Sequence, residues 1–92
     1  MPVSVIKKDA TEEPFDQDKI ARVVTAAGIN PSDGLELASR IAAWVQSLGK
    51  PKITTFQLRE KVIEEMEKIN KITADLFAQY EKTKDIEYQR DH

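Results

Sequence analysis

The stretch VIKKDATEEPFDQDKI, residues 5–20, predicts a strand, a turn, a second strand and the start of a helix. Its β-branched residues 5–6 indicate the first strand, and the Asp9-Ala10 step indicates a tight turn. Residues 11–13 return as the second strand, and the proline that follows ends the pairing because it has no N–H to donate to a sheet. We therefore expect a β-hairpin at the start of the fold.

Asp16 occupies the position of a helix N-cap in the same stretch. Phe15 before it and Ile20 four positions after it have the spacing of a hydrophobic staple, which fixes how the chain enters a helix. Lys19 then falls in the first helical turn, where the helix dipole disfavours a cation by about 0.3–1 kcal/mol. An anionic ligand at this turn would remove that conflict.

Three lysines around this helix start predict a phosphate site. Lys7 and Lys8 end the first strand and Lys19 lies on the first helical turn, where the N–H groups of a helix N-terminus favour anions. Side chains alternate between the two faces of a regular strand, so Lys7 and Lys8 reach one ligand only if the strand ends or twists there. The alternative is an ordinary solvated face, and spacing alone leaves both interpretations open.

Two helices are predicted after the hairpin. The first ends near Gly28, and the second begins with Asn30 as cap and Pro31 in the first helical position, and stops at Gly49. Trp44 flanks the second apolar stripe and is interpreted as a partly buried packing residue. The positions expected to face the core are Ile20, Val23, Val24 and Ala27, then Leu35, Ala38, Ile41, Ala42, Val45 and Leu48.

A third strand and two more helices complete the pattern. Residues 52–54 form a short strand, and Thr54 then caps the third helix through a capping box with Gln57. The polar step at residues 70–71 starts the fourth helix, and fraying is expected from Lys82 onward. The predicted class is α+β, mostly α: a four-helix bundle capped by a short N-terminal hairpin or three-stranded sheet. The expected core positions are Leu58, Val62, Met66 and Ile69, then Ile72, Leu76, Phe77 and Tyr80.

The composition bounds the class of protein. A chain of 92 residues, 40% hydrophobic and 33% charged, suits a single domain over residues 1–92, with a core from about 3 to 84 and a polar tail over 85–92. No apolar run approaches the roughly 20 residues that cross a bilayer. The absence of cysteine and of a signal-peptide pattern indicates a cytoplasmic protein. The net charge of −2 argues against a membrane partner and against direct binding of nucleic acid.

Catalytic motifs are absent from the sequence. It contains no Gly-x-x-x-x-Gly-Lys loop, no H-E-x-x-H and no G-x-S-x-G. Its one histidine is the terminal His92, which leaves no buried imidazole for a general base or a metal. We therefore expect neither catalysis nor a metal site built by the protein.

Three motifs lie in order along the chain. The opening V-I-K-K-D-A-x-E-E-P-F-D-x-x-K-I is similar to a family pattern of roughly V-x-K-[RK]-D-G, then an acid, a hydrophobic-Asp/Asn pair and K-I. Ile53-Thr-Thr-x-x-Leu58 with Val62 is similar to I-T-T-x-x-I-x-x-x-V, and the last helix carries aromatic residues like the family's Tyr-rich end. From about Val3 to Lys84 the chain therefore resembles the ATP-cone, the nucleotide-binding regulatory domain of many ribonucleotide reductases and of their bacterial transcriptional repressor.

The resemblance implies a site for ATP or dATP with Mg²⁺. Lys7 and Lys8 match the family's basic pair and Lys19 matches the lysine of its K-I step, all near the phosphates. Glu13 would instead face the base, because a carboxylate accepts from the 6-amino donor of adenine. Thr55 matches the family's second threonine, although an ordinary helix-start hydroxyl is an equal alternative. The implied nucleotide-binding residues are Val5, Lys7, Lys8, Glu13, Asp16, Lys19, Ile20, Thr55, Arg59 and Lys82.

Two residues depart from the family pattern. Ala10 replaces the usual turn glycine, so a left-handed conformation there costs about 1 kcal/mol. Glu81 stands where members often carry an arginine, which removes one cation from the nucleotide side or from the contact with a further domain.

The preferred hypothesis is a non-catalytic regulatory module. ATP or dATP would bind between the hairpin, the first helix and the third helix start, and shift the population of packings that another protein reads. The partners implied are a reductase, kinase or regulator domain in cis or trans, or a second copy of the chain. The first alternative is a helical protein-interaction module of the same fold that has lost nucleotide binding, which the two departures favour. A small enzyme acting on a nucleotide is the second.

Overall fold

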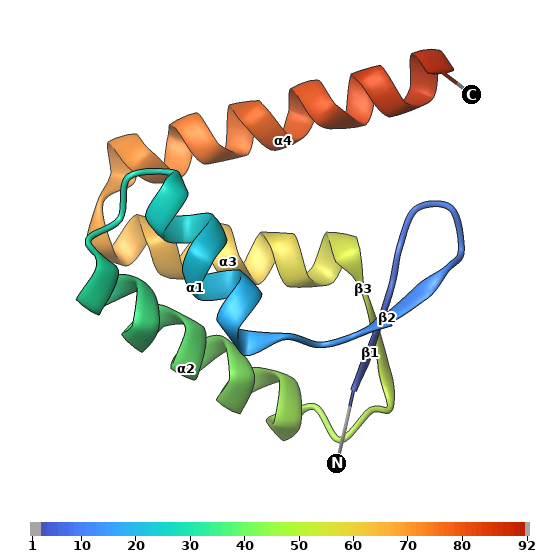
Figure 1. Ribbon diagram of the computed structural model, residues 1–92, viewed down its shortest axis with the longest axis horizontal. Coiled ribbons are helices and arrows are strands. Elements are labelled where there is room, and N and C mark those ends of the chain that lie inside the picture. The colour runs from blue at the N-terminus through green and yellow to red at the C-terminus, as the bar shows by residue number, and fades with distance from the viewer. Residues whose placement is uncertain (1–2, 92) are drawn as a thin grey trace.

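A three-stranded sheet lies beside four helices in the computed structural model, which describes residues 3–91 and the side chains of residues 3–83. The elements in chain order are β1 (Ser4–Ile6), β2 (Glu12–Pro14), α1 (Gln17–Ala26), α2 (Pro31–Ser47), β3 (Lys52–Thr54), α3 (Thr55–Ile69) and α4 (Lys71–Asp91). Figure 1 shows α1 and α3 in the middle, α2 and α4 on opposite edges, and the sheet to one side. This architecture confirms the predicted α+β class.

Strand β1 forms the middle of the sheet, whose order is β2-β1-β3. It pairs antiparallel with β2, as the predicted hairpin requires, and parallel with β3, so that Val5 lies between Glu13 and Ile53. The strand ends at Ile6. The side chains after Ile6 therefore need not alternate between the two faces of the sheet. The end of the strand was the condition under which Lys7 and Lys8 could reach one ligand.

The hairpin turn contains a residue in a strained conformation. Ala10 has a φ of 70°, in the left-handed region that favours glycine. Its N–H donates to the Lys7 carbonyl at 2.9 Å, and the Lys7 N–H donates to the Thr11 carbonyl at 2.8 Å. The Asp9 carboxylate accepts from the Thr11 hydroxyl at 2.6 Å and from its N–H at 3.1 Å. These two bonds lower the pKa of Asp9 and hold the turn closed.

The predicted capping signals are all present. The Asp16 side chain accepts from the Lys19 N–H at 3.2 Å at the start of α1. Asn30 caps α2, and Thr54 forms the capping box with Gln57 at the start of α3. The two predicted staple residues, Phe15 and Ile20, pack against the core.

The core lies between the sheet and the facing sides of the four helices. Trp44 is partly buried against it, as interpreted from the sequence, and its ring lies 5.7 Å from the Lys61 ammonium. Burial of this apolar surface is the main force that holds the small domain together. The largest fully buried side chains are Val24, Leu37, Ile41, Val45, Ile53 and Met66.

The predicted apolar stripe of α4 is wrong at three of its four positions. Ile72, Leu76 and Tyr80 are 75%, 59% and 61% exposed. The helix is rotated so that Ala74 is buried together with Phe77, the one predicted position that faces the core. Periodicity finds the apolar positions of a helix, but the neighbouring helices decide which of them are covered.

The predicted stripes of α1 and α2 are each wrong at one position. Val23 is 37% exposed and Leu35 is 64% exposed. In the first turn of α2 the buried residue is Gly34, and a Cβ built on it would lie 2.7 Å from the Thr25 hydroxyl of α1. The two helices approach closely at this point because the residue has no side chain.

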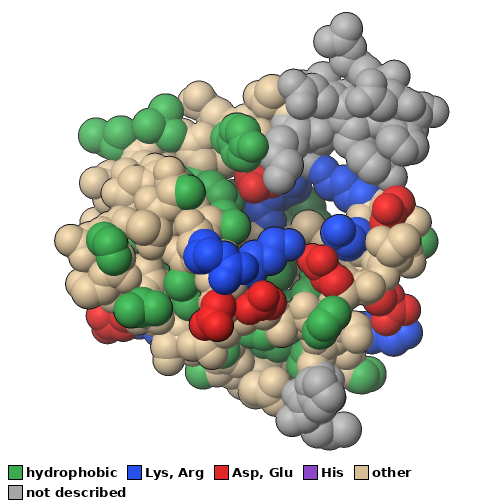
Figure 2. Space-filling view, in the orientation of Figure 1, with side chains coloured by type: hydrophobic (Ala, Val, Ile, Leu, Met, Phe, Trp, Pro, Cys, Tyr) green, Lys and Arg blue, Asp and Glu red, His purple; other side chains and the backbone are tan. Residues whose placement is uncertain are grey.

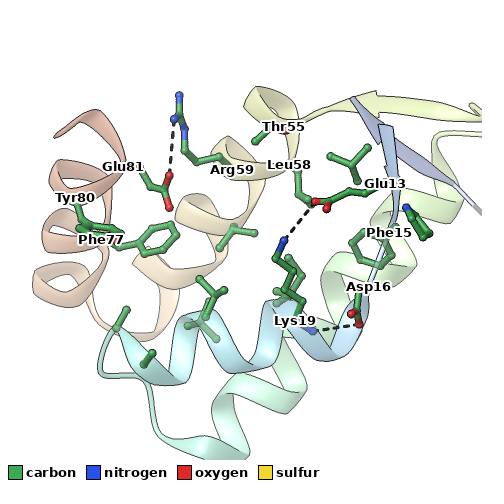
Figure 3. Close-up of a pocket in the computed structure, with 18 of the residues that line it drawn as sticks. Glu13, Phe15, Asp16, Lys19, Thr55, Leu58, Arg59, Phe77, Tyr80 and Glu81 are labelled. Carbon is green, nitrogen blue, oxygen red and sulfur yellow. Dashed lines mark hydrogen bonds and ion pairs between the residues drawn. The ribbon is translucent and has the colours of Figure 1, made fainter. Parts of the chain in front are cut away.

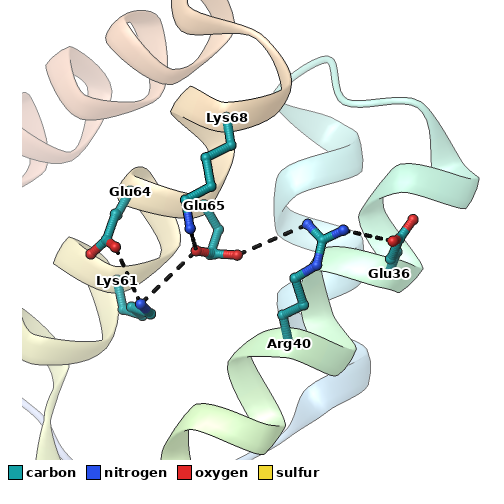
Figure 4. Close-up of polar contacts among 6 residues, drawn as sticks. All are labelled: Glu36, Arg40, Lys61, Glu64, Glu65 and Lys68. Carbon is teal, nitrogen blue, oxygen red and sulfur yellow. Dashed lines mark hydrogen bonds and ion pairs between the residues drawn. The ribbon is translucent and has the colours of Figure 1, made fainter.

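A buried carboxylate joins α2 to α3 on the side shown in Figure 4. Glu65 is only 4% exposed and accepts from the Lys68 ammonium at 2.8 Å. The Lys61 ammonium and the Arg40 guanidinium lie 3.9 Å from it. The bond from Lys68 lowers the pKa of Glu65, and the nearby cations add to that effect. This burial was not predicted, because Glu65 flanks the apolar stripe of α3.

Helix α4 continues to Asp91, beyond the point at Lys82 where the sequence becomes polar. The backbone is helical up to Asp91 over the segment where fraying was predicted, and the side chains of the predicted tail over residues 85–92 lie outside those that the structure describes. Among the described residues, no helix is long and apolar enough to cross a membrane.

Candidate functional site

A cavity of about 780 Å³ opens between the sheet and helices α1, α3 and α4. Figure 3 shows side chains from all these elements converging on it. The volume falls in the range of small-molecule sites, which are usually apolar clefts with a few convergent polar groups. Within the described chain, no group of three or more metal-ligating side chains is present.

Most of the predicted site residues meet in this cavity. The strand, the hairpin return and the first helical turn reach it from one side, and the start of α3 reaches it from another. The predicted residues that line it are Val5, Glu13, Asp16, Lys19, Ile20, Thr55 and Arg59. The predicted residues outside its lining are Lys7, Lys8 and Lys82.

Glu13 links two of the predicted lysines at the mouth of the cavity. Its carboxylate lies 3.3 Å from the Lys19 ammonium and 3.7 Å from the Lys7 ammonium. Lys7 therefore approaches the site through Glu13 without lining the cavity. The helix cap at Asp16 sets this geometry, because it fixes the first turn of α1 and so the position of Lys19.

Thr55 has a structural role whatever it contacts in the cavity. Its hydroxyl donates to the Ile6 carbonyl at 3.0 Å and so ties the start of α3 to β1. This bond supports the interpretation of Thr55 as an ordinary helix-start hydroxyl. The hydroxyl oxygen keeps acceptor capacity that a ligand donor can use.

Arg59 lies one turn further along α3, on the same wall as Thr55. Its guanidinium is 4.0 Å from the Glu81 carboxylate of α4, and the two side chains are only 12% and 17% exposed. The guanidinium carbon also lies 5.5 Å from the centre of the Phe56 ring. Figure 2 shows basic and acidic side chains next to each other across the middle of this face, so the surface is of mixed charge.

The apolar walls of the cavity were only partly predicted as site residues. Val23, Leu76 and Tyr80 were expected in the core, and their exposed surfaces instead line the cavity. Glu81 was noted only as a departure from the family pattern, and it too lines the cavity. An aromatic and aliphatic wall suits a planar ring, with the tyrosine hydroxyl as a polar tip. The further lining residues are Pro14, Phe15, Val24, Ala26, Ala27, Leu58, Val62 and Phe77.

Comparison with known protein families gives a match over nearly the whole described chain. The family described as "ATP cone domain" matches residues 3–85. This chain belongs to the ATP-cone family. The ATP cone is a regulatory, non-catalytic domain, which agrees with the prediction that the chain is not an enzyme.

The chain is also similar to bacterial proteins named "Transcriptional repressor NrdR". It is 32% identical to the one from Streptococcus equi subsp. zooepidemicus over 92 residues, which cover 95% of this chain and 56% of that protein. It is 35% identical to the one from Bartonella henselae over 78 residues, which cover 80% of this chain and 49% of that protein. This ATP-cone chain thus spans about half the length of the curated relatives it matches.

Proposed function

We propose that this ATP-cone domain binds ATP or dATP, accompanied by Mg²⁺, in the cavity between the sheet and helices α1, α3 and α4. The observation that carries the proposal is the convergence of seven predicted nucleotide-binding residues on one cavity of about 780 Å³. Five of these residues belong to the opening stretch over residues 5–20, and the other two, Thr55 and Arg59, come from α3, which is far away in the sequence. The meeting of these two segments at one cavity supports the predicted position of the site between the hairpin, the first helix and the third helix start.

The two kinds of wall in the cavity match the two ends of a nucleotide. Lys19 and Arg59 supply cations from α1 and α3, and a guanidinium is well suited to a phosphate. Val23, Leu76 and Tyr80 supply an apolar surface for the base and sugar. The Glu13 carboxylate accepts from the adenine 6-amino group once it separates from the Lys19 ammonium, now 3.3 Å away, because that amino group and the phosphates lie at opposite ends of the nucleotide.

The position of the cavity suits the transmission of a signal. A ligand in it contacts the hairpin, α1, α3 and α4 together, so it favours one packing of these elements over others. An attached domain or a partner protein then reads the surface that this packing presents. Because the relatives are named transcriptional repressors, we propose a DNA-binding regulator in the cytoplasm as the protein whose state is controlled.

A protein-interaction module without nucleotide is the second candidate. The observation that favours it is that both cations lining the cavity already lie within 4.0 Å of a carboxylate, Lys19 beside Glu13 and Arg59 beside Glu81. The exposed Ile72 on α4 would then belong to a protein contact. This candidate predicts that no adenine nucleotide binds.

Isothermal titration of the purified domain with ATP and dATP in the presence of Mg²⁺ distinguishes the two candidates. The proposed site predicts saturable binding that Lys19→Gln weakens about tenfold, through loss of one charge-assisted contact. The matched control is Lys50→Gln, which removes a lysine from an exposed loop outside the cavity lining. Equal affinities for the two variants would place the nucleotide elsewhere, and no heat of binding to the unaltered domain would favour the second candidate.

A further inference from the structure

Glu81 lies inside the candidate site, on the inner side of α4. It lines the cavity, and its carboxylate is 4.0 Å from the Arg59 guanidinium on α3 (Figure 3). Both side chains are largely covered, at 17% and 12% exposure. An ion pair shielded in this way is less screened by water than a surface pair, so a change in it has a larger effect on binding.

A carboxylate and a phosphate oxygen are alternative partners for the same guanidinium. Both are bound through the planar N–H fork of arginine, with similar geometry. A phosphate that approaches Arg59 must therefore compete with a carboxylate that is already in place.

The charges of the cavity lining add to this competition. Among the side chains that the structure describes, the lining contains the carboxylates of Glu13, Asp16 and Glu81 and two cationic side chains, those of Lys19 and Arg59. Repulsion by these carboxylates opposes any anion, and that of Glu81 acts at the wall where Arg59 would attract a phosphate.

We propose that Glu81 is a residue that sets the affinity of this site for phosphate ligands, because it acts as an internal counter-anion that a ligand phosphate must displace from Arg59. This inference rests on the proposed function and assigns a role to a residue outside the predicted site. Displacement has the same cost for every ligand that binds Arg59 through a phosphate, and the charge of Glu81 repels a polyphosphate more than a monophosphate, so Glu81 lowers the affinity for triphosphates at least as much as that for monophosphates. Displacement also separates Glu81 from Arg59, and thereby couples the occupied cavity to the contact between α3 and α4.

The test is a titration of the domain and its variants with ATP, AMP and inorganic tripolyphosphate, each with Mg²⁺. Glu81→Gln keeps the shape of the side chain and removes its charge, and it should bind ATP and tripolyphosphate about fivefold more tightly than the unaltered domain. The control Glu67→Gln removes the same charge from an exposed position of α3 outside the lining, and it should change neither affinity. AMP affinity should rise by no larger a factor than ATP affinity, because the gain cannot exceed the displacement cost that the ligand paid and Glu81 repels the more highly charged ligand more strongly.

A double-mutant cycle separates this role from a merely structural one. In the Arg59→Gln background, Glu81→Gln should give a smaller gain in ATP affinity, because the competition for the guanidinium no longer exists and only the direct repulsion of the ligand by Glu81 is removed. A thermal unfolding scan of each variant checks that it is folded. Binding by the unaltered domain with no gain in Glu81→Gln would overturn the inference and leave the proposed function intact. An equal gain with and without Arg59 would also overturn it. Absence of binding by both the unaltered domain and Glu81→Gln would overturn the proposed function and this inference together.

Discussion

The Lys19 ammonium lies 3.3 Å from the Glu13 carboxylate, across the junction at which the hairpin enters helix α1. Glu13 is held by strand pairing with Val5, and Lys19 by the helix cap at Asp16. Two local devices, a sheet register and an N-cap, thus position the polar groups at the mouth of the cavity. A change at either residue is expected to alter binding with little effect on the core.

Glu13→Ala should weaken ATP binding about tenfold, because it removes the proposed acceptor for the adenine 6-amino group. Inosine triphosphate carries an oxygen in place of that amino group, so its affinity should change much less. Competition titrations with the two nucleotides measure the difference. The same loss for both would show that Glu13 acts through the lysines and does not recognise the base.

Ala10→Gly should stabilise the domain by about 0.5–1 kcal/mol, because φ at this position is 70° and glycine adopts it without strain. Urea denaturation of the two proteins measures the change in the free energy of unfolding. The control is Ala43→Gly at an exposed position of α2, which should destabilise the domain by about 1 kcal/mol. A loss of stability at position 10 would mean that the hairpin turn in solution differs from the one described.

Gly34→Ala should destabilise the domain by about 1–3 kcal/mol, although alanine is the better helix former. The added methyl group would lie 2.7 Å from the Thr25 hydroxyl oxygen, so α1 and α2 must separate or Thr25 must move. In the Thr25→Ala background the loss should be smaller. Chemical denaturation of the four proteins tests this, and a gain from Gly34→Ala alone would contradict the close approach of the two helices.

Glu65→Gln should lower the stability at pH 7 by about 1–3 kcal/mol, because a buried carboxylate with a charge-assisted bond from Lys68 loses its charge. The pKa of Glu65 in the folded chain is lowered from its ordinary value of 4.5. The contribution of Glu65 to the free energy of unfolding is thus fully present above pH 4.5 and is lost as the pH falls through the pKa of the folded state. The stability of the variant should depend less on pH below 4.5. Denaturation midpoints of the unaltered domain and the variant are to be measured between pH 3 and 7. Parallel curves of midpoint against pH would refute this prediction.

Local signals explain which parts of the fold were predictable. The N-caps at Asp16 and Thr54 and the hairpin follow from neighbouring residues, and all are present. The left-handed conformation of Ala10 was not predicted, because the sequence has alanine where glycine would adopt it without strain. Leu35 and Tyr80 were predicted to face the core and are exposed, because the way in which separate helices cross decides which apolar side chains are covered. That information is tertiary, and no pattern within one helix contains it.

The candidate site divides in the same way. Residues in the opening stretch, such as Glu13 and Lys19, were found because a family motif and a helix start coincide there, and they line the cavity. The α4 wall was missed because Leu76 and Tyr80 have the spacing of core residues. Lys82 was assigned from sequence alone and is exposed outside the cavity lining.

The measurement that tests the central claim most directly is thermal unfolding of the domain with and without ATP or dATP and Mg²⁺, for the unaltered chain and for the Lys7→Ala, Lys19→Ala double variant. At about 100 times its dissociation constant, a ligand of the folded state should stabilise it by about 2.7 kcal/mol. We predict such a shift for the unaltered chain and its loss in the double variant, while a Lys50→Ala, Lys71→Ala control keeps it. No shift with either nucleotide, or an equal shift in all three proteins, would contradict the assignment of this cavity as the nucleotide site.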